Sequence, residues 1–277
     1  MNNQEFEMVA RLLKERSGLV VTAEKAYLLD NRLQPVARRF SLDGVDALVS
    51  KLGPGGDEKL KAAVVEAMTT NESLFFRDLK PFDQLRDIVL PKMLEARAAT
   101  KRIRIWSAAC SSGQEPYSIA MLIEEQKAKF AGWKIEITAT DLSNEMLEKA
   151  RTGIYSQFEV QRGLPITMLV KYFTQQGERW QINQDLRSKI QFKEFNLLKH
   201  PKLLGKFDIV FCRNVLIYFD QPTKAQVLSG IADVLEPDGA MYLGGAETVL
   251  GISNRFEPVP EQRGAYRVSG GGVRASA

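Results

Sequence analysis

Residues 102–120 read RIRIWSAACSSGQEPYSIA, and this stretch decides the fold. A short run with β-branched residues leads into Ser, Ala, Cys and Gly, which are small enough to let a backbone approach a ligand closely. Pro116 then stands where the first turn of a helix tolerates proline. The stretch therefore predicts a strand, a tight turn and a helix that together form a nucleotide-type ligand site.

A second strand is expected at residues 134–140, and it ends at Asp141. A carboxylate at this position can accept hydrogen bonds from both ribose hydroxyls of a nucleoside. Asp141 follows Gly113 by 28 residues (141 − 113), and Gly113 is the only glycine of the loop, whereas an NAD site has three glycines and an acid roughly 20 residues on. The pattern argues against NAD. The alternative is a surface aspartate that caps a helix beginning near Ser143.

The composition indicates a soluble globular protein of one or two domains, with 277 residues, 44% hydrophobic and 26% charged. No apolar run approaches the roughly 18 residues of a membrane span, and the first residues do not resemble a signal sequence. We therefore expect no membrane insertion and a cytoplasmic location. The net charge of +4, with bases and acids interleaved, does not favour a general nucleic-acid binder.

Metal chemistry and histidine catalysis are not expected. The two cysteines, Cys110 and Cys212, form no CxxC pair and no cluster with histidine. Both are interpreted as small buried hydrophobic residues. The single histidine, His200, lies in a loop-like segment, where a solvated side chain is favoured over a catalytic base.

The order of predicted elements indicates three parts. Residues 1–70 show helical patterns only and are expected to form an all-α N-terminal domain. Residues 71–268 are expected to form an α/β domain with a doubly wound, mostly parallel, Rossmann-like sheet whose crevice lies at the carboxyl ends of its strands. Residues 269–277 have the composition of a flexible tail. The strand candidates are residues 102–106, 134–140, 189–196, 207–213 and 240–244.

One segment interrupts the alternation of strands and helices. Residues from about 152 to 188 contain a short helix followed by a hairpin pattern that turns at Gly177. We predict a small antiparallel β-subdomain inserted into the larger sheet domain.

Four separated segments, in this order along the chain, resemble the chemotaxis receptor methyltransferases, the CheR family. They are TTNESLFFR at 69–77, WSAACSSGQEPYS at 106–118, ATD at 139–141 and FCRNVLIYF at 211–219. LEPDG at 235–239 also resembles a turn common in S-adenosylmethionine-dependent methyltransferases. The resemblance covers nearly the whole chain. It implies transfer of a methyl group from S-adenosylmethionine to glutamate side chains of chemoreceptor signalling helices, which yields γ-methyl esters and S-adenosylhomocysteine.

This reaction does not need the groups that the chain lacks, namely a histidine base and a metal site. A glutamate acceptor, with an ordinary pKa of about 4.3, is already an anion at neutral pH, and a sulfonium methyl group is already activated. The enzyme has to align the reacting atoms and desolvate the carboxylate, without a general base or a metal.

The resemblance also assigns a cofactor site. Arg77 would pair with the methionyl carboxylate and is, with Tyr218 beside the transferring methyl group, one of two candidate catalytic residues. Glu115 would accept from the methionyl ammonium and Asp141 from the ribose. The other expected contacts are Asn71 and Ser73 next to Arg77, Asn196 and Leu197 at the adenine, and Arg213 and Asn214 at the methionine end.

Besides Asp141, three of these residues have alternative interpretations. Asn71 and Ser73 are residue types that also cap helices. The less favoured alternative for Tyr218 is a core aromatic residue next to Phe219.

Receptor recognition is expected in the N-terminal domain. Lys25, Arg32 and Arg39 recur every seven residues and would share one helix face, with Arg38 nearby, opposite glutamate-rich receptor helices. The alternatives are a merely solvated charged face, or a helix that Pro35 bends or breaks. Some family members also bind a C-terminal receptor pentapeptide along the hairpin, but they have a longer connection than residues 175–178 provide. Pentapeptide binding is therefore predicted to be absent.

Two other functions stay open. One is a methyltransferase of the same fold acting on RNA or a small molecule, which would have a basic groove with interleaved aromatics or an Asn-Pro-Pro-Tyr-type motif in place of residues 213–218. Neither feature is present. The other is a non-catalytic cofactor-binding signalling module, which the complete set of cofactor positions disfavours.

Overall fold

The computed structural model describes residues 2–270, and for Lys25 only the backbone. The chain forms two compact units. One contains the chain through Thr70 together with Tyr218–Lys224, and the other contains Asn71–Ile217 and the chain from Ala225 onward. The predicted flexible tail falls outside the described residues from residue 271 on.

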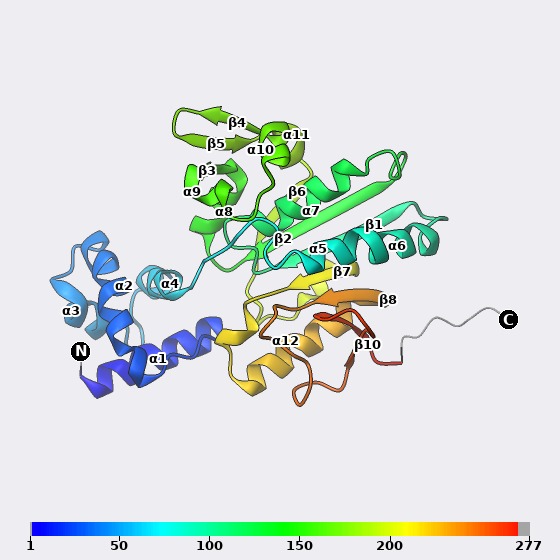
Figure 1. The fold of residues 1–277 in the computed structure, drawn as a ribbon. Helices are drawn as coiled ribbons and strands as arrows, with labels where there is room; N and C mark the ends of the chain where they lie inside the picture. The colour runs from blue at the N-terminus through cyan, green and yellow to red at the C-terminus, as the bar shows by residue number, and fades with distance from the viewer. Residues whose placement is uncertain (1, 271–277) are drawn as a thin grey trace. The chain divides into compact units, whose positions relative to one another are not determined.

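The first unit is helical (Figure 1). Its first helix starts with a capping box between Asn2 and Glu5 and ends at Gly18 in the left-handed conformation. Pro35 lies inside the second helix and does not end it. The core consists of fully buried aliphatic residues, among them Leu13, Leu29, Leu33, Leu48 and Val64. The elements are α1 Asn3–Ser17, η1 Ala23–Lys25, α2 Ala26–Arg39, α3 Gly44–Ser50 and α4 Glu58–Met68.

A late segment of the chain completes this unit. Phe219 pairs with Leu19 in an isolated antiparallel bridge, and the Lys14 ammonium lies 2.7 Å from an Asp220 carboxylate oxygen. The segment begins at the last residue of the short helix η4, Leu216–Tyr218, and includes the first turn of α12, Gln221–Val234.

The second unit contains a seven-stranded sheet in the order β6-β2-β1-β7-β8-β10-β9 (Figure 1). The first five strands in this order are parallel, and β10 pairs antiparallel with β8 on one side and with β9 on the other. The predicted Rossmann-like, mostly parallel sheet is confirmed. The strands are β1 Arg102–Ala108, β2 Lys134–Asp141, β6 Ile190–Glu194, β7 Phe207–Cys212, β8 Leu235–Tyr242, β9 Phe256–Pro258 and β10 Ala265–Val268.

The strand order reverses between β1 and β7. The chain runs from β1 to β2 and β6 on one side, and from β7 to β8 on the other. Right-handed crossovers then place α7, Gln114–Glu125, and α8, Asn144–Thr152, on one face of the sheet and the later turns of α12 on the opposite face. The carboxyl ends of β1 and β7 therefore flank the topological switch point, where open α/β sheets bind ligands.

The core of this unit is rich in buried aromatic side chains. Phe211 on β7 stacks on Tyr242 of β8, with the ring centroids 4.7 Å apart, and Trp106 on β1 is fully buried. Helices α5 Lys80–Gln84, η2 Leu85–Val89 and α6 Leu90–Ala96 precede β1, and η3 Pro201–Leu204 precedes β7.

The predicted inserted subdomain is present as a second, three-stranded antiparallel sheet in the order β3-β5-β4. The connection between β4 and β5 is Gly177-Glu178, and Gly177 has a φ of +61°, which glycine adopts without strain. The elements are β3 Ile154–Ser156, α9 Gln157–Gln161, α10 Ile166–Tyr172, β4 Phe173–Gln176, β5 Arg179–Ile182 and α11 Gln184–Arg187.

Two details of the sheet differ from the sequence prediction. Strand β8 begins at Leu235 instead of residue 240, because Leu235 pairs with Phe207 and Ala240 pairs with Ile209 on either side of a register shift. Strands β9 and β10 were not predicted, since both are short and lack clear alternation. Within residues 2–270, no helix is long and apolar enough to cross a membrane.

Candidate functional site

The loop after β1 is shaped by unusual backbone conformations. Ala109 and Ser111 have φ values of +56° and +50°, which L residues adopt only when their surroundings hold them. Gly113, at the start of α7, has a φ of +94°, and a Cβ there would lie 2.9 Å from the Ala150 Cβ. Only glycine fits where α7 approaches α8.

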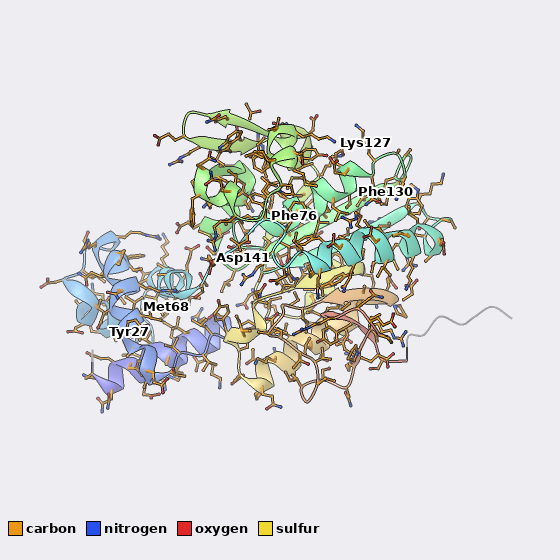
Figure 2. The ribbon with its side chains drawn as sticks, in the orientation of Figure 1. Tyr27, Met68, Phe76, Lys127, Phe130 and Asp141 are labelled. Atoms are coloured by element: carbon orange, nitrogen blue, oxygen red, sulfur yellow. The ribbon has the colours of Figure 1, made fainter. Side chains whose placement is uncertain are left out.

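Asp141 holds this loop from the end of β2 (Figure 2). Its Oδ2 accepts a hydrogen bond of 2.7 Å from the Ser111 amide, and its Oδ1 accepts one of 2.9 Å from the Ser143 amide. The surface-cap alternative is wrong, because Asp141 is buried and Ser143 itself caps α8 by accepting from the Met146 amide. A carboxylate can accept up to about four hydrogen bonds, and ribose hydroxyls are donors of the kind it accepts.

A buried ion pair joins the start of α7 to the residue after β7. The Glu115 Oε1 accepts from the Ser107 hydroxyl at 2.8 Å, and its Oε2 lies 3.0 Å from Nη1 of Arg213. The Arg213 side chain is only 1% exposed. Its Nη2 donates to Asp78 Oδ2 at 2.7 Å and to the Arg77 carbonyl at 2.8 Å. Arg213 thus links three segments of the second unit.

Burial dominates the electrostatics of these groups. It raises the pKa of Glu115 above its ordinary value, although Arg213 and Ser107 act in the opposite direction. Burial also raises the pKa of the Cys110 and Cys212 thiols well above their ordinary range. Both cysteines are free and buried, in agreement with the prediction.

The segment from Asn71 to Leu79 approaches the same loop. The Asn71 carbonyl accepts from the Ser111 hydroxyl at 2.8 Å, and the Phe76 amide donates to the Ser118 hydroxyl at 2.9 Å. Helix α4 ends at Met68 and α5 begins at Lys80, so the helix-cap alternative for Asn71 and Ser73 is wrong.

Arg77 lies in this segment and is half-buried. Its Nη1 donates to the Glu72 carbonyl at 3.3 Å. Three nearby residues, Phe76, Asp78 and Leu79, have φ values of +49°, +68° and +47°. The backbone around Arg77 therefore requires support from its neighbours, which the Arg213 bonds to Arg77 and Asp78 provide.

The ends of β6 and β7 contribute the remaining predicted residues. The Phe195 amide donates to the Asp141 carbonyl at 2.9 Å, so Asn196 and Leu197 follow at the edge of the sheet where Asp141 lies. Both are half-buried, and the Asn196 side chain accepts from the Leu198 amide. Asn214 has a φ of +59° directly after Arg213.

Tyr218 belongs to the first unit. Its carbonyl accepts from the Val20 amide at 2.9 Å. Tyr218 is half-buried, whereas Phe219 is buried. A place for the Tyr218 phenol beside the transferring methyl group stays a prediction.

Sequence reasoning missed Glu247. Its carboxylate accepts from four backbone amides, those of Asn214, Val215, Ile217 and Gly244, at 2.8, 2.9, 3.2 and 2.7 Å. The available signal was the pair Gly244-Gly245 shortly after β8, because glycine after a strand often marks a close backbone approach.

The predicted docking residues differ from one another in their surroundings. Lys25 lies in η1, before α2 begins, and its side chain is outside the described residues. Arg32 is half-buried and donates to the Met68 and Thr69 carbonyls at 2.9 and 2.8 Å. Arg38 and Arg39 are exposed on the last turn of α2. Among the predicted docking residues whose side chains the structure describes, Arg38 and Arg39 are exposed and Arg32 is not.

Comparison with known proteins gives a consistent result over both units. Residues 71–265 match the family described as CheR methyltransferase, SAM binding domain, and residues 4–69 match the CheR methyltransferase all-alpha domain. The chain is 42% identical over 263 residues to chemotaxis protein methyltransferase 1 of Vibrio cholerae, covering 94% of each protein. It is 33% identical over 262 residues to the chemotaxis protein methyltransferase of Escherichia coli K12, covering 92% of this chain and 88% of the relative.

Proposed function

The chain belongs to the CheR methyltransferase family, and from this premise we propose that it methylates glutamate side chains on the signalling helices of chemoreceptors. The family makes it an S-adenosylmethionine-dependent methyltransferase of chemotaxis. The proposed products are glutamate γ-methyl esters and S-adenosylhomocysteine. We place the reaction in the cytoplasm, because the proposed substrate is the cytoplasmic part of the receptor.

One observation supports this proposal most strongly. Asp141 at the end of β2 and Glu115 at the start of α7 both bond to the β1 strand-and-loop segment, through Ser111 and Ser107, at the switch point of the sheet. Two carboxylates are thereby fixed at the edge where a nucleoside ligand binds.

The chemistry of these groups fits S-adenosylmethionine. The Asp141 carboxylate would accept from the ribose, and the Glu115 carboxylate would attract the methionyl ammonium. Arg77, with Asn71 and Ser73 from the same segment, would bind the methionyl carboxylate. Asn196 and Leu197 would flank the adenine. Arg213 holds Glu115 and Asp78 and, with Asn214, would close the methionine end.

The reaction requires alignment more than proton transfer. When bound, the cofactor supplies an activated methyl group on its sulfonium. The acceptor glutamate, with an ordinary pKa of about 4.3, is ionised at neutral pH, so no side chain has to remove a proton. Arg77 would fix the methionine end, and Tyr218 would orient the acceptor carboxylate with its phenol. Alignment and exclusion of water then lower the barrier.

Receptor docking is proposed for the exposed cations of α2. Arg38 and Arg39 would face acidic receptor helices. Arg32 also secures the end of α4 through its bonds to Met68 and Thr69, and Lys25 is retained as a fourth candidate. We further propose that the enzyme works without a C-terminal pentapeptide tether, because the β4–β5 connection has only two residues.

The test is methyl transfer to receptor cytoplasmic fragments. Labelled S-adenosylmethionine should give protein-bound label that mild alkali releases, as expected for a carboxyl ester. A fragment in which the modified glutamates are changed to alanine is the control. Cofactor binding without transfer would instead support the signalling-module alternative, and label on RNA or a small molecule would support a different substrate class.

A further inference from the structure

Glu247 lies between the loops that follow two neighbouring strands. It is half-buried in the turn after β8, and its own amide donates to the Gly244 carbonyl at 2.9 Å. Its Oε1 accepts from the amides of Val215 and Ile217, and its Oε2 accepts from those of Asn214 and Gly244. One side chain thus satisfies three amides of the loop after β7.

That loop has a conformation that needs such support. Asn214 has a φ of +59°, which is strained for a residue other than glycine and persists only where the surroundings fix it. Gly244 allows the Asn214 and Glu247 side chains to approach its backbone closely. A Cβ at this position would lie 2.6 Å from the side-chain nitrogen Nδ2 of Asn214 and 2.8 Å from Glu247 Oε2. The loop after β7 is therefore held by a carboxylate that fits only beside glycine.

Glu247 also lies within electrostatic range of the proposed cofactor site. Burial is the main cause of the raised pKa of Glu115, and the negative charge of Glu247 adds to it. The loop begins beside Arg213, which is paired with Glu115, and it ends at Ile217, directly before Tyr218 in the chain. Glu115 thus anchors the start of this loop through Arg213, and Glu247 anchors the loop as far as Ile217.

We propose that Glu247 is a positioning residue for methyl transfer. Its carboxylate fixes the backbone from Asn214 to Ile217, and through it the Asn214 side chain at the proposed methionine end of the cofactor site. This inference rests on the proposed function. It adds a role for a residue that would touch neither the cofactor nor the acceptor.

The test compares Glu247→Gln with two controls. The glutamine keeps the length of the side chain but replaces one acceptor oxygen by an NH2 group, which faces amide donors. We expect kcat for receptor methylation to fall roughly tenfold or more, with the receptor KM little changed. S-adenosylhomocysteine should bind several-fold more weakly in calorimetry. Glu257→Gln, in an exposed ion pair with Arg267, should match the wild type in both measurements.

A variant in the core distinguishes a general loss of stability from a loss of positioning. Ile231→Ala, in the buried face of α12, should lower Tm yet keep kcat and cofactor affinity well below Tm. Hydrogen exchange should show faster exchange of the Asn214, Val215, Ile217 and Gly244 amides in Glu247→Gln only. Unchanged kcat and unchanged cofactor affinity in that variant would overturn the proposal, even with faster exchange. If the wild type methylates no receptor fragment, the proposed function fails, and the calorimetric comparison still decides the role of Glu247.

Discussion

Arg213 and Glu115 form a buried ion pair, with Nη1 of the guanidinium 3.0 Å from Oε2 of the carboxylate. The pair connects the residue after β7 to the first turn of α7, across the switch point of the sheet. Removal of Arg213 would leave Glu115 as an uncompensated buried charge, which costs about 3–5 kcal/mol. Arg213 without Glu115 would still be paired with Asp78. The pair therefore fixes Glu115 where it is proposed to meet the methionyl ammonium.

The raised pKa of Glu115 predicts a pH dependence of cofactor binding. Its carboxyl group becomes neutral as the pH falls through this raised pKa, and it would then lose its proposed attraction for the methionyl ammonium. We expect the affinity for S-adenosylhomocysteine to decrease as the pH falls from neutral toward the raised pKa of Glu115, by at most about tenfold per pH unit. Calorimetry in this range checks the prediction. Glu115→Gln should bind weakly with little pH dependence, and an equally steep decrease in that variant would contradict the assignment.

Asp141→Ala should weaken binding of both S-adenosylmethionine and S-adenosylhomocysteine. The lost charge-assisted bonds correspond to roughly 1.5–3 kcal/mol, or about ten- to a hundredfold in affinity. Asp141→Asn keeps the shape of the side chain and one acceptor oxygen, so it should fall between the wild type and Asp141→Ala. Glu194→Ala, an exposed carboxylate at the end of β6, is the control and should bind normally. Unchanged affinity in Asp141→Ala would remove this residue from the site.

Arg77→Ala and Tyr218→Phe should differ in which step they affect. Arg77 is proposed to bind the methionyl carboxylate, so its loss should raise the dissociation constant of the cofactor. Tyr218 is proposed to orient the acceptor, so the loss of its hydroxyl should lower kcat with cofactor affinity unchanged. Arg86→Ala, in an exposed pair with Asp87, is the control for the arginine. Normal turnover in Tyr218→Phe would return that residue to a packing role.

The sequence predicted those parts of the molecule whose structure is determined by a short, local residue pattern. Strands β1, β2 and β7, the loop with Gly113 and the hairpin at Gly177 each have a signal within about ten residues, either alternation or glycine at a turn. The contacts of Glu247 and Arg213 were not predicted, because bonds to backbone amides and carbonyls leave no residue pattern. Arg32 shows the same limit, since its spacing indicated an open face whereas its guanidinium bonds to the end of α4.

Charge reversal at the end of α2 tests receptor docking. Arg38→Glu with Arg39→Glu should raise the apparent KM for the receptor fragment and leave cofactor binding intact, because both side chains are exposed. Added salt should raise the KM of the wild type and have less effect on the double variant. Arg32 is avoided here, since its replacement would also release the Met68 and Thr69 carbonyls. Steady-state methylation rates that coincide for the double variant and the wild type would rule out docking by these two residues.

Receptor methylation should not depend on the C-terminal pentapeptide. An added peptide strand needs an accessible edge and backbone to grip it. Here β4 and β5 are joined by Gly177-Glu178 alone, and the Trp180 indole donates to the Gln157 side chain at 2.6 Å within the subdomain. Titration of free C-terminal receptor peptides should give no measurable heat, and receptor fragments without these residues should be methylated at the same rate as complete ones. Micromolar binding that a Gly177 or Trp180 substitution abolishes, with a scrambled peptide as the control, would show that the hairpin does capture a tether.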